Sequence, residues 1–198
     1  MKNILKNNKL KIYLYYLLLL IISIFFYYQH NLNADEGVVL NGAWNLFNNQ
    51  ILYTDFFEMI APGSFYLIYF GFKLFGVKFA VANIISLLMI WGSSIGLYKS
   101  LNLIRFNRLN FLWPLFFLLA LTPLPIINHN THNLFFLIWS SYFFLLGLKN
   151  NSFKYFAISG LFSGLAIIFL QQKGLIFFGA SCLFLLFYLI KNKTNFSP

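Results

Sequence analysis

Acidic residues are scarce in this sequence: only four Asp and Glu occur among 198 residues, against fourteen Lys and Arg. Charged residues make up 9% of the chain, whereas a soluble domain has roughly a quarter. This shortage excludes an ordinary soluble fold. The chain has one cysteine, Cys182, which excludes a disulfide framework and a Cys-based metal site. Because Cys182 lies within an apolar run, we interpret it as a packing residue.

Hydrophobic residues are abundant, at 60% of the chain, and aromatic residues reach 22%. The net charge of +10 could suggest nucleic-acid binding, but the basic residues stand singly or in pairs between apolar runs and form no basic stripe. We therefore expect no nucleic-acid partner. The composition predicts an all-α protein, a polytopic transmembrane helical bundle that forms a single domain over residues 1–198.

Six apolar runs have the length of a bilayer-crossing helix, since spans of about 16–20 residues suit a hydrocarbon core of about 30 Å. They cover residues 12–28, 79–98, 110–127, 132–148, 155–170 and 174–190. Pro114 predicts a kink in the third run, and polar turns are expected at 128–131, 149–154 and 171–173. The first run could also be a signal peptide cleaved after Ala34, but its length, its tyrosine flanks and the membrane sequence that follows favour a retained helix.

The segment 34–76 contains all the acidic residues of the chain: Asp35, Glu36, Asp55 and Glu58. Within it, residues 35–49 place apolar side chains on one side and asparagines on the other, which predicts an amphipathic helix along the membrane surface. Residues 50–61 are expected to be irregular, and 62–76 to form a short, tilted or partly inserted helix. The segment is thus predicted to be an extracytoplasmic loop with juxtamembrane helices.

The orientation follows from the basic residues, because cytoplasmic loops of membrane proteins are enriched in Lys and Arg. With six spans, eleven of the fourteen basic residues fall on the side of the two termini, and three fall on the other side: Lys73, Lys78 and Lys173. Both termini are therefore predicted to be cytoplasmic, in a multi-pass plasma-membrane protein. The acidic segment, the histidine-containing turn and the Gln171–Lys173 turn would then share the outer face.

Asp35 and Glu36 follow the first span directly. Asp35 could simply cap the surface helix, with Glu36 favoured in the first turn by the helix dipole. A carboxylate held rigidly there could also accept a proton from a hydroxyl, as general-base catalysis requires. Adjacent helical residues point about 100° apart, so only one of the two is expected to face a substrate, and we favour Asp35. Asp55 is either a second functional acid or a solvated loop charge.

Further polar residues on the predicted outer side are candidates for binding. His129 and His132 have too few neighbouring ligands for a metal site, so hydrogen bonding to a phosphate or sugar is the preferred interpretation. Lys173 could snorkel to the surface or hold a lipid-linked phosphate. Gly160 and Gly164, beside Ser159 and Ser163, predict a surface for close helix packing. The sequence has no phosphate-binding glycine loop, no Asp-x-Asp pair and no hydrolase triad.

The order of these features resembles the GT-C class of polytopic membrane glycosyltransferases, specifically the protein-mannosyltransferase-like and aminoarabinose-transferase-like group (glycosyltransferase family 39-like). The resemblance rests on the Asp35-Glu36 pair, the stretch from Asn49 to Phe57, the proline turn from Ala61 to Tyr66 and the ending at Leu74-Phe75-Gly76. Later features also match: the histidines of the second outer loop, the Gly-Leu-Ala helix from Ser159 to Ala166, and Gln171-Gln172-Lys173-Gly174.

The resemblance implies inverting transfer of a hexose or pentose from a polyprenyl-phosphate donor to a lipid, glycan or protein acceptor on the outer face. It implies that Asp35 is the base and Glu36 its partner in the motif. Donor and acceptor contacts are implied for Tyr53, Asp55, His129, His132, Gln171, Gln172 and Lys173. It implies no bound metal at these residues and leaves an assisting divalent cation open as a cofactor.

Two departures from the family pattern matter. Many relatives have a lysine before the proline turn, where this chain has Ile60-Ala61-Pro62, so Lys173 or a histidine must supply the positive charge. Relatives also have about twice as many spans, which predicts an N-terminal fragment of a longer enzyme, an inactive remnant, or a chain that works with a partner subunit. A small transporter or flippase-like subunit is the alternative class, although transporters keep ionisable groups near the midplane of their spans.

Overall fold

The computed structural model describes residues 2–27, 33–121 and 126–192, and within these ranges the regular structure is helical. The helices are α1 (Lys2–Tyr27), α2 (Ala34–Phe47), α3 (Gly63–Phe75), α4 (Phe79–Ile104), η1 (Arg108–Phe111, a 3-10 helix), α5 (Leu112–Leu121), α6 (His129–Asn150), α7 (Phe153–Phe169) and α8 (Gln171–Asn192). The predicted all-α class is therefore confirmed.

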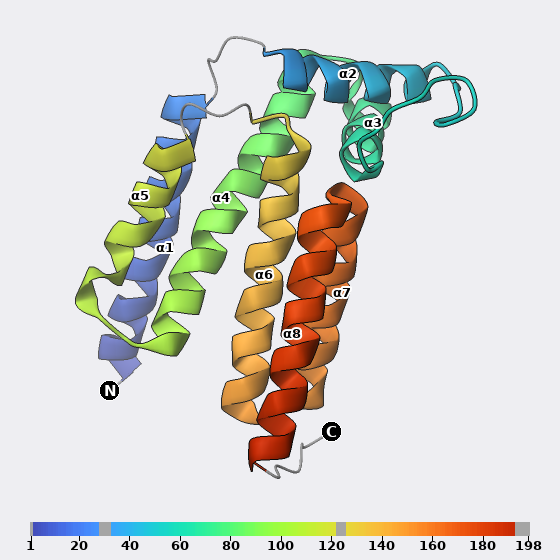
Figure 1. Cartoon of the computed structure of the whole chain (residues 1–198). Helices are drawn as coiled ribbons and strands as arrows, with labels where there is room; N and C mark the ends of the chain where they lie inside the picture. The colour runs from blue at the N-terminus through green and yellow to red at the C-terminus, as the bar shows by residue number, and fades with distance from the viewer. Residues whose placement is uncertain (1, 28–32, 122–125, 193–198) are drawn as a thin grey trace.

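The longer helices run side by side, and α2 lies across one end of the bundle with α3 beneath it (Figure 1). The start of α1 and the end of α8 both lie at the opposite end (Figure 1). This arrangement is the one expected from an even number of crossings. It separates the surface helix from the two ends of the chain, while the cytoplasmic placement of the termini stays a prediction.

In the part of the chain that the structure describes, four helical segments are long and apolar enough to cross a membrane: Leu10–Tyr27, Phe79–Ile104, His129–Asn150 and Gln171–Lys191. Two further apolar helical segments, Leu109–Leu121 and Phe153–Phe169, are shorter. All six correspond to predicted spans. The structure thus confirms a helical membrane bundle, and the count of six crossings stays a prediction for the two shorter helices.

The third predicted span, 110–127, is wrong at its end. Helix α5 stops at Leu121, and Ile126 to Asn128 form a buried, non-helical approach to α6. Residues 122–125, which include the expected stop signals Pro123 and Pro125, lie outside the described residues. Pro114 lies in the first turn of α5, where a proline removes no intrahelical hydrogen bond, and the irregularity is the 3-10 turn η1 that precedes it.

The predicted polar turns are also shorter than expected. His129 to Thr131 belong to α6, Lys149 and Asn150 are its last residues, and Gln171 to Lys173 form the first turn of α8. The connection from α7 to α8 is a single extended residue, Leu170. The predicted turns were too long because polar residues were taken to be non-helical, whereas Gln and Lys are good helix formers.

The surface helix α2 has the predicted amphipathic character. Val39, Ala43 and Leu46 are buried, whereas Asn41 and Asn48 are exposed. Trp44, which was expected on the apolar side, is 46% exposed. The buried face is instead continued by Gly42, where a Cβ atom would lie 2.6 Å from the Phe65 ring of α3. The two juxtamembrane helices thus pack closely on each other.

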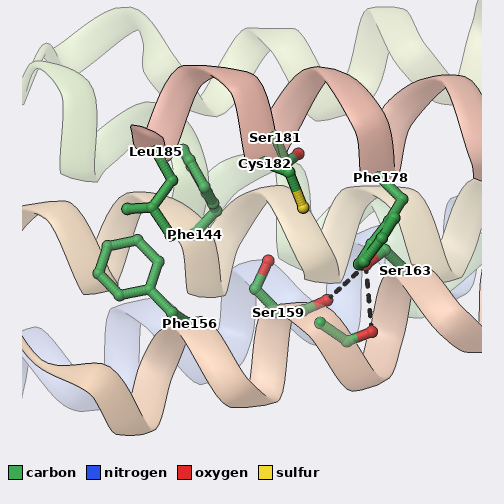
Figure 2. A pocket seen from close by; sticks show the side chains of 9 residues that line it. Phe144, Phe156, Ser159, Ser163, Phe178, Ser181, Cys182 and Leu185 are labelled. Atoms are coloured by element: carbon green, nitrogen blue, oxygen red, sulfur yellow. Dashed lines mark hydrogen bonds between the residues drawn. The ribbon is translucent and has the colours of Figure 1, made fainter. Parts of the chain in front are cut away.

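The small residues of α7 pack through serines rather than glycines. Ser140 of α6 donates to the Ser159 carbonyl, and Ser159 donates to the Ser140 carbonyl, both at 2.9 Å. No described atom lies within 4 Å of a Cβ placed on Gly160 or Gly164. Beside them is a cavity of about 90 Å³ between α6, α7 and α8, into which the side chains of Ser159, Ser163 and Cys182 point (Figure 2).

We expect opposite effects of alanine at two helical glycines. A Cβ on Gly174 would lie 2.6 Å from the Ile167 Cα, and backbone cannot move aside as a flexible side chain can. Gly174→Ala is therefore expected to destabilise the protein by about 1–3 kcal/mol. Gly160→Ala meets no neighbour and should stabilise α7 by about 0.5–1 kcal/mol. Thermal unfolding of both variants in detergent tests this, and equal melting temperatures would contradict the packing of α8 on α7.

Candidate functional site

The N-terminus of α2 is closed by a capping box. The Asn33 side chain accepts a hydrogen bond from the Asp35 N–H at 2.8 Å, and Glu36 Oε2 accepts from the Asn33 N–H at 3.2 Å. Such reciprocal bonds satisfy backbone donors that a helix start leaves unpaired. Asn33, not Asp35, is therefore the cap. The Asp35 carboxylate is left available for other contacts.

Glu36 points into the protein. Its side chain is fully buried, and Oε1 accepts hydrogen bonds from the backbone N–H groups of Ile126 at 2.9 Å and Ile127 at 3.1 Å. The carboxylate thus fastens the segment before α6 to the start of α2. Its neighbour Asp35 is exposed. The two acids face different surroundings, as the helical geometry of adjacent residues predicts.

Asp35 is linked to Lys173 by a chain of side-chain hydrogen bonds. Asn128, which caps α6, donates from Nδ2 to Asp35 Oδ2 at 3.2 Å. Asn130 Nδ2 donates to Asn128 Oδ1 at 3.1 Å, and Lys173 Nζ donates to Asn130 Oδ1 at 2.8 Å. We call these four side chains the outer cluster. It joins α2, α6 and α8 and places a carboxylate and an ammonium group at the two ends of one polar network.

The two candidate histidines have different surroundings. His129 lies beside the outer cluster, with Nε2 3.2 Å from Asn130 Nδ2, and is within electrostatic reach of both Asp35 and Lys173. His132 is fully buried. Its ring nitrogens lie 2.9 Å from Ser64 Oγ of α3 and 2.8 Å from Ser86 Oγ of α4. His132 therefore connects three helices.

The other predicted site residues lie apart from the outer cluster. Tyr53 and Asp55 belong to the loop that leaves the far end of α2, away from Asp35 (Figure 1). Asp55 Oδ2 accepts from the Ile51 N–H at 2.7 Å, and the Tyr53 hydroxyl donates to the Ile60 carbonyl at 3.4 Å. Both contacts close the loop on itself. Gln171 and Gln172 are exposed in the first turn of α8, next to Lys173.

A cavity of about 140 Å³ opens beside Lys173. Its walls include Leu121 of α5 and Leu134 and Leu137 of α6, and its polar lining includes Asn130 and Asn133. The cavity is therefore lined by leucines on one side and by a lysine and asparagines on the other. Sequence reasoning missed Asn128, Asn130 and Asn133. The available signal for Asn130, Asn133 and Leu137 was their spacing, because positions three or four apart share a helix face; Asn128 precedes the helix as its cap.

Over residues 2–27, 33–121 and 126–192, no three His, Cys, Asp or Glu side chains gather into a group that could hold an ion. The outer cluster contributes one carboxylate, and its remaining groups are two amides and an ammonium. Its chemistry is that of hydrogen bonding, proton acceptance and anion binding.

The chain matches a known protein family over most of its length. Residues 60–197 match the family described as dolichyl-phosphate-mannose-protein mannosyltransferase. The matched region includes α3 to α8, with Asn128, Asn130 and Lys173, and begins after Asp35 and the Tyr53–Asp55 loop. No curated protein and no solved structure matches the chain significantly. Because the match covers well over half of the sequence, the chain belongs to the dolichyl-phosphate-mannose-protein mannosyltransferase family.

Proposed function

We propose that the chain carries out transfer of a sugar from a polyprenyl-phosphate-linked donor to an acceptor hydroxyl at the outer face of the plasma membrane. The observation that carries this proposal is the outer cluster, in which an exposed carboxylate and a lysine are joined through two asparagines. The family match supports a membrane glycosyltransferase with a lipid-phosphate donor. The family name refers to mannose, and we take mannose as the first sugar to test.

Each end of the outer cluster has a role in the proposed reaction. The acceptor oxygen bonds to the anomeric carbon as the bond from that carbon to the phosphate oxygen breaks, which inverts the configuration. Asp35 takes the proton of the acceptor hydroxyl, as a general base. Lys173 contacts the departing lipid phosphate and stabilises the negative charge that develops on it. Gln171 and Gln172, next to Lys173 in sequence, are proposed to contribute further donor contacts.

The remaining predicted residues receive different roles. We propose that Glu36 is a positioning residue, because its carboxylate holds the backbone before α6 and so sets Asn128 against Asp35. His132 positions α3, α4 and α6 through its two serine contacts. His129 is proposed to contact the substrate phosphate or sugar. Tyr53 and Asp55 are proposed to shape a loop that contacts the acceptor.

The proposed orientation places the outer cluster where a periplasmic or cell-surface acceptor can reach it. α2 and the start of α6 lie at the end of the bundle opposite the start of α1 (Figure 1). If the termini are cytoplasmic, as the distribution of basic residues predicts, this end faces outward. Cysteine-accessibility labelling of an introduced Asn41→Cys, on the exposed side of α2, checks the orientation in intact cells.

The experiment that tests the function uses the full chain in its own membranes, so that any partner subunit is present. Membranes receive radiolabelled polyprenyl phosphate mannose, and transfer to endogenous lipid, glycan and protein is measured separately. Removal of one charge-stabilising group typically lowers kcat about 10²–10³-fold. We expect a loss of that order for Lys173→Gln.

Lys78→Gln is the matched control, since Lys78 is exposed, has the same charge and is predicted to lie on the same face. It is expected to retain wild-type transfer. Equal activity of the Lys173 and Lys78 variants would remove Lys173 from the mechanism. Absence of transfer in wild-type membranes with this donor, and with its pentose counterpart, would overturn the proposed function.

A further inference from the structure

The side chain of Asn133 presents a buried acceptor without a partner. Asn133 is fully buried, and its Oδ1 atom has no hydrogen-bond partner among the described residues. The amide orientation is fixed, because the other terminal atom lies 2.6 Å from the Ala166 carbonyl oxygen and must therefore be the Nδ2 donor. An unpaired buried acceptor destabilises a protein. A bound molecule that donates a hydrogen bond to this oxygen would therefore be stabilising.

Asn133 lines the same cavity as Lys173. Asn130, Asn133 and Leu137 follow one another along one side of α6, and Lys173 is bonded to Asn130. Three residues of helix rise by about 4.5 Å, so Asn133 lies about one turn deeper than the lysine contact. An anion at Lys173 and a hydrogen-bond donor at Asn133 would thus be separated by about the size of one small polar group.

The volume and walls of the cavity indicate what fits. Its volume of about 140 Å³ is far above the roughly 10–15 Å³ that one water needs. Its polar lining residues, Asn130, Thr131, Asn133 and Lys173, can bind a polar group, whereas Leu121, Leu134 and Leu137 offer only apolar contact. Lys173 donates to a neutral amide oxygen, which leaves its charge available for an anion.

We propose that this cavity binds a phosphate ester that carries a hydroxyl group, with the phosphate at Lys173 and the hydroxyl donating to Asn133 Oδ1. The inference rests on the proposed function, because the glycosylated lipid donor has this chemistry and Asn133 would then distinguish it from the bare lipid phosphate. A membrane phospholipid such as phosphatidylglycerol has the same chemistry. A measurement of binding distinguishes the glycosylated lipid donor from a membrane phospholipid, and it does not depend on sugar transfer.

The test measures lipid binding to the purified full chain by native mass spectrometry. The four probes are polyprenyl phosphate mannose, bare polyprenyl phosphate, phosphatidylglycerol and phosphatidic acid, which lacks the hydroxyl-bearing head group. The key variant, Asn133→Leu, keeps the size of the side chain and removes the acceptor. The Ala166 carbonyl stays paired in this variant, because it also accepts from the Leu170 N–H at 2.9 Å. We therefore expect the apo variant to melt no lower than the wild type.

We expect the wild type to bind polyprenyl phosphate mannose more tightly than the bare lipid by on the order of 10-fold, the cost of leaving such an acceptor unpaired. Asn133→Leu should lose this preference and keep its affinity for the bare lipid, whereas Lys173→Gln should bind both weakly. Asn102→Leu is the control: it makes the same chemical change in the last turn of α4, at a residue that does not line the cavity. Its partner Asn110 keeps a bond to the Arg105 carbonyl, so binding should match the wild type.

The outcomes separate the two ideas. A preference for phosphatidylglycerol over phosphatidic acid that Asn133→Leu abolishes, without a preference for the mannosyl lipid, would support the site and assign it to a bilayer lipid. Asn133→Leu binding all four probes as the wild type does would overturn the inference and leave only water in the cavity. If the Asn133 variant binds like the wild type but the wild type transfers sugar, the inference fails and the proposed function stands. If the wild type prefers the mannosyl lipid but transfers no sugar, the proposed function fails and the inference stands.

Discussion

Asp35→Asn is expected to insert and fold like the wild type and to lose sugar transfer by about 10²–10⁴-fold, the usual contribution of a general base. The substitution is nearly isosteric. The Asn33 side chain bonds to the backbone N–H of residue 35 and not to its side chain, so the capping box is preserved. An asparagine oxygen can still accept from Asn128, so the variant removes the proton acceptor and keeps the hydrogen-bond chain.

The measurement is the initial rate of transfer from labelled polyprenyl phosphate mannose, normalised to the amount of protein in the membrane. Glu58→Gln is the matched control, because Glu58 lies in the same 34–76 segment and is partly exposed. It should retain most of the activity. Equal rates for Asp35→Asn and the wild type would remove Asp35 as the base and leave the outer cluster as a binding site.

Glu36→Ala is expected to have the largest effect on stability. It removes the acceptor of the Ile126 and Ile127 N–H groups, which are buried together with the carboxylate. Each buried donor left unpaired costs about 1–3 kcal/mol, and the capping contact to Asn33 is lost as well. We expect a strongly lowered melting temperature in detergent and rapid proteolysis before α6.

Glu36→Gln is the informative comparison. Its amide oxygen can replace Oε1 and keep both isoleucine contacts, while its amino group would face the Asn33 N–H and lose that single bond. The melting temperature of the glutamine variant should therefore lie between those of the wild type and the alanine variant. If Glu36→Ala and Glu36→Gln have the same melting temperature, the carboxylate does not anchor the segment before α6.

Much of the architecture could be predicted because membrane helices are specified by composition. The six apolar runs correspond to helices in the structure. The asparagines of α2 correctly indicated which side of that helix is exposed. The ends of the elements were less predictable. Gln171 to Lys173 continue a helix although they are polar, and the segment before α6 is held by a glutamate 90 positions away in sequence. No local pattern contains such a contact.

The candidate site was predicted in part for the same reason. The topology placed Asp35, His129 and Lys173 on one face, and the structure brings them to one network. The asparagines that join them were treated as turn residues, because polar residues near a span end are usually solvated. His132 was expected to face a substrate, yet it lies inside between two serines. His129 is the first residue of α6, whereas His132 lies three positions further along the helix, where α3 and α4 pack against it.

The bond from Lys173 to Asn130 also has a consequence for biosynthesis. The carboxylate comes from α2, near the beginning of the chain, whereas the ammonium comes from the first turn of α8. The ribosome synthesises α2 before α8, at about 5–20 residues per second. A nascent chain that has released only α1 to α7 from the ribosome holds Asp35 without its cationic counterpart. Under the proposed roles of Asp35 and Lys173, we therefore expect no transfer before α8 has entered the bilayer and packed against α7.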